Sequence, residues 1–553
     1  MRRGVLALSL AVCAVLATEQ GPNNGPTTTS VSGQFRGSWM ESRRGRLFQA
    51  YRGIRYAEPP VGELRFQPPK PILSYARKVD ASAEGPACPL IAPPEYYIDE
   101  DCLRLNVYTP NNNRLAALPV VVYIHPGGFY SMTGRSDVSG PHYLLDRDLV
   151  LVTINYRLGS LGFLSTGDEL APGNNGFKDQ VAALKWVKRN IAAFGGDPEL
   201  VTVAGCSAGA ISAMLLMISP MSQGLFHRAI SMSASPLGKE PLPQDLYRLA
   251  IRQAQIVNCP TDNSSIIVSC LKKASWRDLG NSYNKFYEFG FDPVAIWSPV
   301  VERDFGQARF LAEQPEESIR RSRHLLPHLI SQTTDEFFWK AFTVLKNQTL
   351  VNEMNANWEQ VAPISFQLPR NNAAGPARRL RSEYLKDEPL RDDRLSADRL
   401  GKLYGDAIIG FNTHRMANFM CRHSDKKVFY AEFAYIGNHS YFEDPDTGKP
   451  TKAAHHDDTI YLLSQSYRFP AVPADGSADS LVVDRMTGIW YNFAKYGNPN
   501  GPGSSPSLPT HWPAMTPARR QYMVLAEPLT VRANMFEDRF KIWDELYPID
   551  YDN

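Results

Sequence analysis

The segment 205–209 (GCSAG) constrains the fold of this 553-residue chain more than any other feature. It follows the apolar, β-branched run 200–204 (LVTVA) and precedes a helical pattern that begins near Ala208. A serine between small residues, at a turn from strand to helix, is typical of a nucleophile elbow, which exposes the hydroxyl. An ordinary glycine-rich turn is the alternative, because such strings also arise by chance. The flanking strand and helix favour the elbow and predict Ser207 as a nucleophile.

Strands and helices alternate around this segment. Continuous apolar runs at 119–124 (PVVVYI) and 149–155 (LVLVTIN) predict strands that are buried on both faces. Further strands are expected at 228–232 and 428–434, and an apolar stripe predicts a helix over 179–193. This order predicts an α/β fold, with a large, mostly parallel central sheet and helices on both faces.

The N-terminal region has the pattern of an export signal over residues 1–17. Two arginines precede a short apolar run, and small residues permit cleavage after Ala17. A membrane anchor is the alternative, although the run is too short to span a bilayer. The polar residues 18–30 predict a disordered leader. Residues 31–553 contain no repeat and no long linker, so we expect a single domain there.

Cysteines and glycosylation sequons agree with a secreted, extracellular protein. Cys88 lies close in sequence to Cys102, as Cys259 does to Cys270, so two short disulfide loops are expected. The other cysteines of the expected mature chain have no obvious partner; they are Cys206 and Cys421. Three sequons are candidate glycosylation sites, and they begin at Asn263, Asn347 and Asn438.

The charge balance excludes some classes of partner. Lys and Arg total 59 and Asp and Glu total 57, which gives a net charge of +2. Such a balance provides no electrostatic reason to expect nucleic acid or an acidic membrane surface. No cluster of side chains has the spacing of metal ligands, so we expect neither a metal nor a cofactor.

A glycine pair after the predicted strand 119–124 supplies the second element of a candidate site. A hydroxyl that attacks an ester creates an oxyanion, which preorganised N–H donors must stabilise. We expect Gly127 and Gly128 to present N–H groups for this purpose, and Ala208 to add one from the start of its helix. A plain turn is the alternative, but it would not explain why this loop should lie at the same sheet edge as Ser207.

Longer strings resemble the type-B carboxylesterase and cholinesterase family. They lie at 51–66 (YRGIRYAEPPVGELRF), 100–110 (EDCLRLNVYTP) and 173–210, and the similarity extends from about residue 31 to about residue 543. Arg55 stands where the family usually has proline. The resemblance implies an α/β-hydrolase fold and a serine esterase that hydrolyses carboxylic ester bonds through an acyl-enzyme.

The resemblance also implies an acid for a catalytic triad. The segment 327–337 (PHLISQTTDEF) is similar to the one that carries the triad acid in the family, and it places that acid at Glu336. The glycines that usually flank this segment are replaced by Ser331 and Phe337. Asp335 therefore remains the rival for the same role.

The base is implied in the same way. The segment 453–463 (AAHHDDTIYLL) is similar to the family segment that carries the catalytic histidine two residues before an acidic pair. That pattern selects His455, with His456 where glycine is usual. The resulting order of serine, acid and histidine along the chain is the order of α/β-hydrolases.

The resemblance further supports both disulfide pairs and narrows the range of substrates to expect. Choline-ester hydrolases of the family hold the quaternary ammonium with a tryptophan in a long first disulfide loop, but the loop 88–102 is short and has none. The residue before the serine is often glutamate in the family and commonly glutamine in its insect hormone esterases, whereas here it is Cys206. We therefore expect small, uncharged ester substrates. The alternatives are a non-catalytic adhesion protein and an ester-binding scavenger on the same fold.

Overall fold

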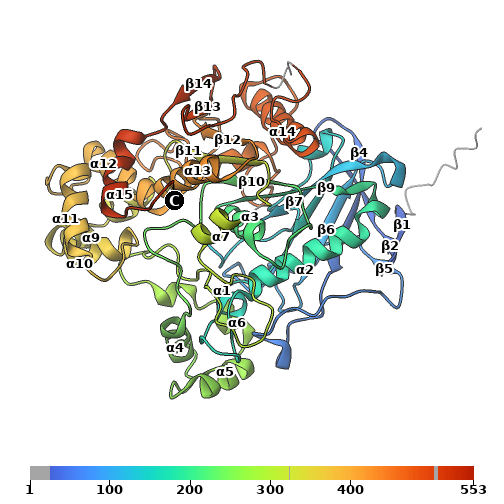
Figure 1. Ribbon diagram of the computed structural model, residues 1–553, viewed down its shortest axis with the longest axis horizontal. Helices are drawn as coiled ribbons and strands as arrows, with labels where there is room; N and C mark the ends of the chain where they lie inside the picture. The colour runs from blue at the N-terminus through green and yellow to red at the C-terminus, as the bar shows by residue number, and fades with distance from the viewer. Residues whose placement is uncertain (1–24, 323, 504–507, 553) are drawn as a thin grey trace, which may run out of the picture.

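A computed structural model describes residues 25–322, 324–503 and 508–552 of the chain. Its centre is an 11-stranded sheet in the order β14-β13-β12-β11-β10-β9-β7-β8-β6-β4-β3 (Figure 1). The strands of this sheet are β3 (Ser38–Glu41), β4 (Leu47–Arg55), β6 (Arg104–Thr109), β7 (Leu118–Ile124), β8 (Val150–Ile154), β9 (Gly196–Cys206), β10 (Arg228–Met232), β11 (His328–Thr333), β12 (Val428–Phe433), β13 (Gln521–Leu525) and β14 (Thr530–Ala533).

The middle of the sheet is parallel and its margins are antiparallel. From β8 through β7, β9, β10, β11 and β12 to β13, every neighbouring pair is parallel. Antiparallel pairing occurs at β14 on one side and at β6, β4 and β3 on the other. The predicted α/β fold with a mostly parallel sheet is confirmed, and the expected strands coincide with β7, β8, β9, β10 and β12 to within a few residues.

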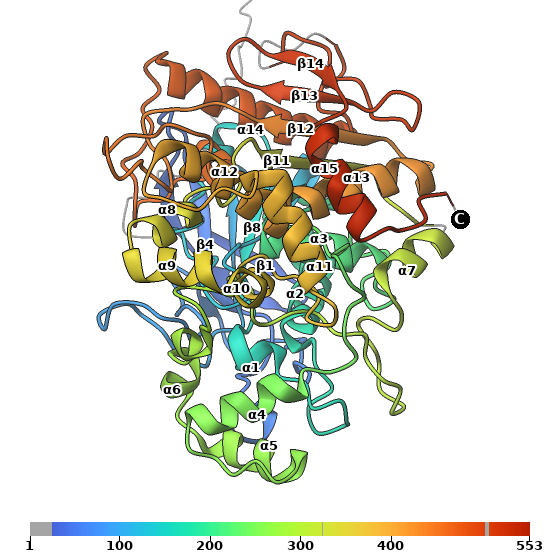
Figure 2. The ribbon, with the colours of Figure 1, turned by 90° about the vertical axis from the view of Figure 1, so that its left-hand side faces the viewer.

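Helices cover both faces of the sheet. In Figures 1 and 2, α2 and α3 lie on one face and α14 on the other. The helices are α1 (Gly159–Phe163), α2 (Asn175–Asn190), α3 (Ala208–Ile218), α4 (Tyr247–Ile256), α5 (Ser264–Lys273), α6 (Trp276–Gly280), α7 (Pro315–Arg321), α8 (Lys340–Leu345), α9 (Gln348–Ala356), α10 (Trp358–Ser365), α11 (Ala374–Leu380), α12 (Arg394–Gly405), α13 (Phe411–His423), α14 (Ala478–Tyr496) and α15 (Glu537–Leu546).

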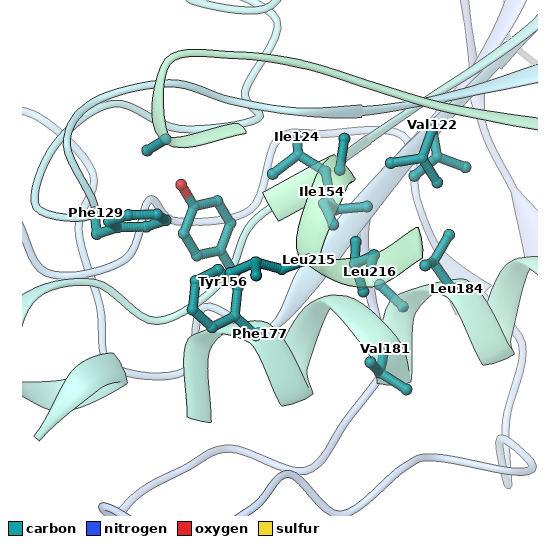
Figure 3. Close-up of a cluster of buried hydrophobic side chains, with 14 of the residues drawn as sticks. Val122, Ile124, Phe129, Ile154, Tyr156, Phe177, Val181, Leu184, Leu215 and Leu216 are labelled. Atoms are coloured by element: carbon teal, nitrogen blue, oxygen red, sulfur yellow. The ribbon is translucent and has the colours of Figure 1, made fainter. Parts of the chain in front are cut away.

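Strand β7 shows why its sequence is apolar without alternation. Val122 and Ile124 pack with residues of α2 and α3, including Leu184 and Leu215 (Figure 3). The intervening side chains Val121 and Tyr123 point to the opposite face and pack against α14. Because successive side chains of a strand point to opposite faces, a strand covered by helices on both sides needs apolar residues at every position.

A third hydrophobic cluster lies away from the sheet. It joins α8, α9, α10, α11 and α12 to α15, with Trp358 and Trp543 among its buried side chains. Figure 1 shows most of these helices gathered at one end of the molecule, to the left of the sheet. Residues from this cluster, such as Phe337, also line the cavity described below.

The structure corrects the extent of the predicted disordered leader. Thr27–Ser30 form strand β1, which pairs antiparallel with β2 (Gly33–Arg36), and β2 also pairs with β5 (Val79–Asp80). The prediction of disorder to residue 30 is therefore wrong for residues 27–30, because pairing with later residues satisfies their backbone groups. The proposed signal, residues 1–17, lies outside the described residues.

Two disulfides join Cys88 to Cys102 and Cys259 to Cys270. The second connects the end of α4 to α5. Cys206 is buried and Cys421 partly buried, and both are free thiols. Within the described ranges, no helix combines the length and apolar character needed to cross a membrane.

Candidate active site

Ser207 lies at the turn between β9 and α3. Its backbone has φ 54° and ψ −119°, which is rare for a residue with a side chain and costs on the order of 1–3 kcal/mol. The N–H of Ser207 donates to the carbonyl of Met232 at 2.8 Å, so the end of β10 holds the turn in place. This is the geometry of a nucleophile elbow.

Close backbone packing explains the glycines on either side of the serine. A Cβ at Gly205 would lie 2.4 Å from the carbonyl carbon of Gly209, and a Cβ at Gly209 would lie 2.1 Å from the carbonyl oxygen of Ile124. Neither approach is possible for a residue with a side chain. The two glycines therefore let α3 start directly against the ends of β7 and β9.

His455 connects Ser207 to Glu336 in one hydrogen-bonded line. Its Nε2 is 3.0 Å from the Ser207 Oγ, and its Nδ1 is 2.5 Å from Glu336 Oε2. The other oxygen of Glu336 accepts the N–H of Thr333 at 2.8 Å. The rival carboxylate, Asp335, is not part of this hydrogen-bonded line and instead pairs with Lys452 Nζ at 3.2 Å.

Burial sets the charge state of this line. It lowers the pKa of His455, so the imidazole is neutral at neutral pH and Nε2 can accept a proton. Burial also raises the pKa of Glu336, although the nearby Ser233 hydroxyl and the Thr333 N–H favour the carboxylate. When His455 becomes an imidazolium during turnover, its positive charge would stabilise the carboxylate form of Glu336 further.

Gly127 and Gly128 of the loop after β7 line the same cavity as Ser207. Gly127 has φ 109° and Gly128 has φ 57°, and a Cβ on Gly127 would lie 2.2 Å from the carbonyl oxygen of Ser131. No acceptor among the described residues pairs with the N–H of either glycine. Ala208 is the first residue of α3, so its N–H has no partner within the helix. The loop and the helix start thus present backbone donors to one space.

That space is a cavity of about 650 Å³ with Ser207 and His455 in its wall. Its lining is rich in aromatic residues, namely Phe129, Tyr130, Tyr283, Tyr287, Phe291, Phe337, Trp339, Tyr441 and Phe442. In the part of the chain that the structure describes, no carboxylate lines it. The described lining includes two cations, of which Lys340 pairs with Asp292 at 2.7 Å. Arg468 has no carboxylate partner among the described residues and donates to the carbonyl of Tyr441.

Two neighbours of the triad occupy positions that sequence reasoning did not anticipate. The Cys206 side chain does not line the cavity. The thiol instead lies 3.2 Å from Nδ1 of His456, whose ring does line the cavity. The sequence signal for this contact is the histidine at position 456, where the family usually has glycine.

Comparison with known proteins places this geometry in a family. A model of the Carboxylesterase family matches residues 24–543. Esterase FE4 of Myzus persicae is 37% identical over 504 residues, 88% of this chain and 87% of the relative, and juvenile hormone esterase of Tribolium castaneum is 34% identical over 496 residues, 86% and 84% of the two chains.

A solved structure agrees in fold. The crystal structure of juvenile hormone esterase from Manduca sexta, with OTFP covalently attached, superposes with a TM-score of 0.82 at 27% identity. The match covers 95% of this chain and 99% of that one. The nucleophile elbow, the triad-like line and these matches lead to one conclusion: the chain belongs to the carboxylesterase family and is a carboxylic ester hydrolase.

Proposed function

We propose that this chain is a secreted serine carboxylesterase that hydrolyses small, uncharged esters through an acyl-enzyme on Ser207. The observation that carries the proposal is the line from the Ser207 Oγ through His455 to Glu336 at the wall of an aromatic cavity. Each group has the partner that its role requires.

The chemistry follows from the geometry. Nε2 of His455 takes the Ser207 proton as the Oγ attacks the carbonyl carbon of the ester. The N–H groups of Gly127, Gly128 and Ala208 stabilise the oxyanion. His455 then returns the proton to the departing alcohol and leaves an acyl-enzyme. Water, deprotonated by His455, attacks the acyl carbon, and the bond from this carbon to the Ser207 Oγ breaks. The Oγ takes the proton back from His455 as the acid leaves, and Glu336 stabilises the transient imidazolium.

An organophosphonate probe should label Ser207, because only an activated serine displaces the leaving group of such a probe quickly. Intact-mass and peptide mass spectrometry would locate the adduct. Ser235, another serine of the cavity wall, provides the matched control. Label should persist in Ser235→Ala and be absent from Ser207→Ala. Label that remains in Ser207→Ala would contradict the assignment, and a wild-type chain without label would favour the non-catalytic alternative.

Uncharged esters should be better substrates than cationic ones, because the lining described has an unpaired arginine and no carboxylate. Butyrylcholine and its uncharged isostere 3,3-dimethylbutyl butyrate give a comparison at equal size. We expect kcat/KM to favour the uncharged ester by about tenfold, which corresponds to about 1.4 kcal/mol. Arg468→Gln should reduce this preference. A higher kcat/KM for butyrylcholine would mean that the aromatic wall holds the cation instead.

Secretion is supported by the signal pattern, the two disulfides and the exposed sequons. Asn263, Asn347 and Asn438 all lie on the surface. Expression of the full chain in a eukaryotic secretory host should release protein that begins near Thr18 and loses mass on treatment with a peptide N-glycosidase. A non-reducing digest should contain the linked peptides of both disulfides. Free thiols at these four positions in secreted protein would contradict the disulfide pairing, and protein retained in the cells would contradict the extracellular assignment.

A further inference from the structure

A second histidine lies beside the catalytic line and has no part in the reaction described above. His456 follows His455 in sequence, the two ring centroids are 4.0 Å apart, and both rings line the cavity. The backbone of His456 has φ 79°, in the left-handed region that favours glycine. A side chain kept at such a position costs on the order of 1–3 kcal/mol, and such strain is concentrated at functional sites.

The thiol of Cys206 fixes the orientation of this ring. Its Sγ lies 3.2 Å from Nδ1 of His456. Cys206 is completely buried, and burial raises the pKa of its thiol well above the usual range, so the sulfur keeps its proton. Burial, the adjacent His455 and the guanidinium of Arg468 lower the pKa of His456, so the ring is neutral. A neutral imidazole nitrogen is a stronger acceptor than a thiol sulfur, so we assign the S–H as the donor to Nδ1 and the ring proton to Nε2.

The two adjacent histidines thus hold opposite tautomers. His455 carries its proton on Nδ1, which donates to Glu336, and keeps Nε2 as the acceptor for Ser207. His456 has Nδ1 as the acceptor and Nε2–H as a donor. No acceptor among the described residues pairs with this Nε2, and the atom is not enclosed by protein. Because Nδ1 faces the buried thiol, the free donor is on the cavity side of the ring.

The surroundings of His456 make this part of the wall attractive to oxygen atoms. The Tyr441 ring lies 5.2 Å from the His456 ring, and the Tyr441 carbonyl accepts a hydrogen bond from Arg468 at 2.6 Å. The guanidinium has no carboxylate partner in the described part of the chain and lies on the same wall. This wall thus carries a neutral N–H donor and a cation, and each of them favours an acceptor oxygen.

We propose that His456 is a specificity-determining residue, which donates a hydrogen bond from Nε2 to an acceptor oxygen of the substrate other than its reacting carbonyl, and that Cys206 is the positioning residue for this donor. The substrate class is uncharged esters that carry an ether, hydroxyl or second carbonyl oxygen within reach of the ring. This inference rests on the proposed function and adds to it a preference over purely hydrocarbon esters.

Matched esters test the preference. Starting from p-nitrophenyl hexanoate, an ether oxygen replaces in turn each acyl methylene except the one next to the carbonyl. A second series places the ether oxygen in the alcohol group of an alkyl butyrate, from the third carbon outward, so that every member remains a carboxylic ester. His456→Gly removes the ring and tolerates the left-handed backbone. For at least one oxygen position, the ratio of kcat/KM for the ether ester to that for its methylene analogue should fall about 3- to 10-fold in this variant, as expected for one neutral hydrogen bond.

Substitutions at Cys206 show whether its hydrogen bond to His456, and not the volume of its side chain, is what orients the ring. Cys206→Ala removes the donor to Nδ1 and should shift the same ratio in the same direction. Cys206→Ser supplies an O–H donor in its place and should restore the ratio toward the wild-type value. NMR spectra of the wild type and of His456→Gly, both with ¹⁵N-labelled histidine, identify the His456 signals as those absent from the variant. Their ¹⁵N chemical shifts should be those of the Nε2–H tautomer.

The outcomes distinguish this inference from the proposed function. Hydrolysis with an ether-to-methylene ratio that is unchanged in His456→Gly at every oxygen position overturns the specificity role alone. An Nδ1–H tautomer for His456 overturns the role of Cys206 and of the donor. A wild-type chain that hydrolyses none of these esters overturns the proposed function, and the specificity role with it.

Discussion

Ser207→Ala and His455→Ala are each expected to lower kcat for a neutral ester by about 10⁴-fold or more. In the proposed reaction the serine bonds to the acyl group, and Nε2 of the histidine lies at hydrogen-bond distance, 3.0 Å, from its Oγ. Since both act in the same step, the double variant should lose little more than either single one. Steady-state hydrolysis of p-nitrophenyl butyrate, corrected for the spontaneous reaction, measures these losses.

Adjacent residues provide matched controls for this prediction. Glu336→Gln should reduce kcat severely, because it removes the charge that stabilises the imidazolium, whereas Asp335→Asn breaks a contact with Lys452 and should reduce it far less. His456→Gly should likewise lose far less than His455→Ala. A dead Asp335→Asn with an active Glu336→Gln would show that the acid is assigned one residue too late.

Elements with a strong local pattern could be predicted from the sequence. The parallel strands of the centre are apolar at every position, and β7 shows the reason, since its side chains meet α2 and α3 on one face and α14 on the other. The elbow has a local cause too, because its glycines are needed where the backbones of α3 and β7 approach each other. Each of these constraints leaves a pattern in consecutive residues, an apolar run or a serine between two glycines, and that pattern appears directly in the sequence.

Features that depend on distant contacts could not be predicted in the same way. Thr27–Ser30 look like part of a polar leader and become a strand only by pairing with β2. Asp335 and Glu336 are adjacent carboxylates, and the direction in which the chain leaves β11 decides which one reaches His455. The contact of Cys206 with His456 joins residues 250 positions apart, and no local pattern indicates it.

The largest effect on stability is expected from Asp179→Asn. Asp179 of α2 is fully buried and accepts two hydrogen bonds from the guanidinium of Arg157, at 2.7 and 2.8 Å, and one from the Arg157 backbone N–H. Burial raises the pKa of this carboxyl, and Arg157 opposes the shift. In the wild type, this ion pair joins α2 to the segment after β8. The neutral amide of the variant would leave the buried guanidinium of Arg157 without its counter-charge.

Removal of one partner of such a pair costs about 3–5 kcal/mol, because the remaining charge stays buried. Asp179→Asn should therefore lower the midpoint of thermal unfolding by several degrees at a fixed scan rate, as followed by intrinsic fluorescence. The control is Glu199→Gln, which breaks the ion pair between Glu199 and Lys188. The Glu199 side chain is 69% exposed, so water replaces the lost contact and we expect no measurable change in the midpoint. Equal midpoints for Asp179→Asn and the wild type would show that the site relaxes enough to hydrate Arg157. Its other guanidinium contact, to the carbonyl of Gln67 at 2.8 Å, would then be sufficient to hold the arginine in place.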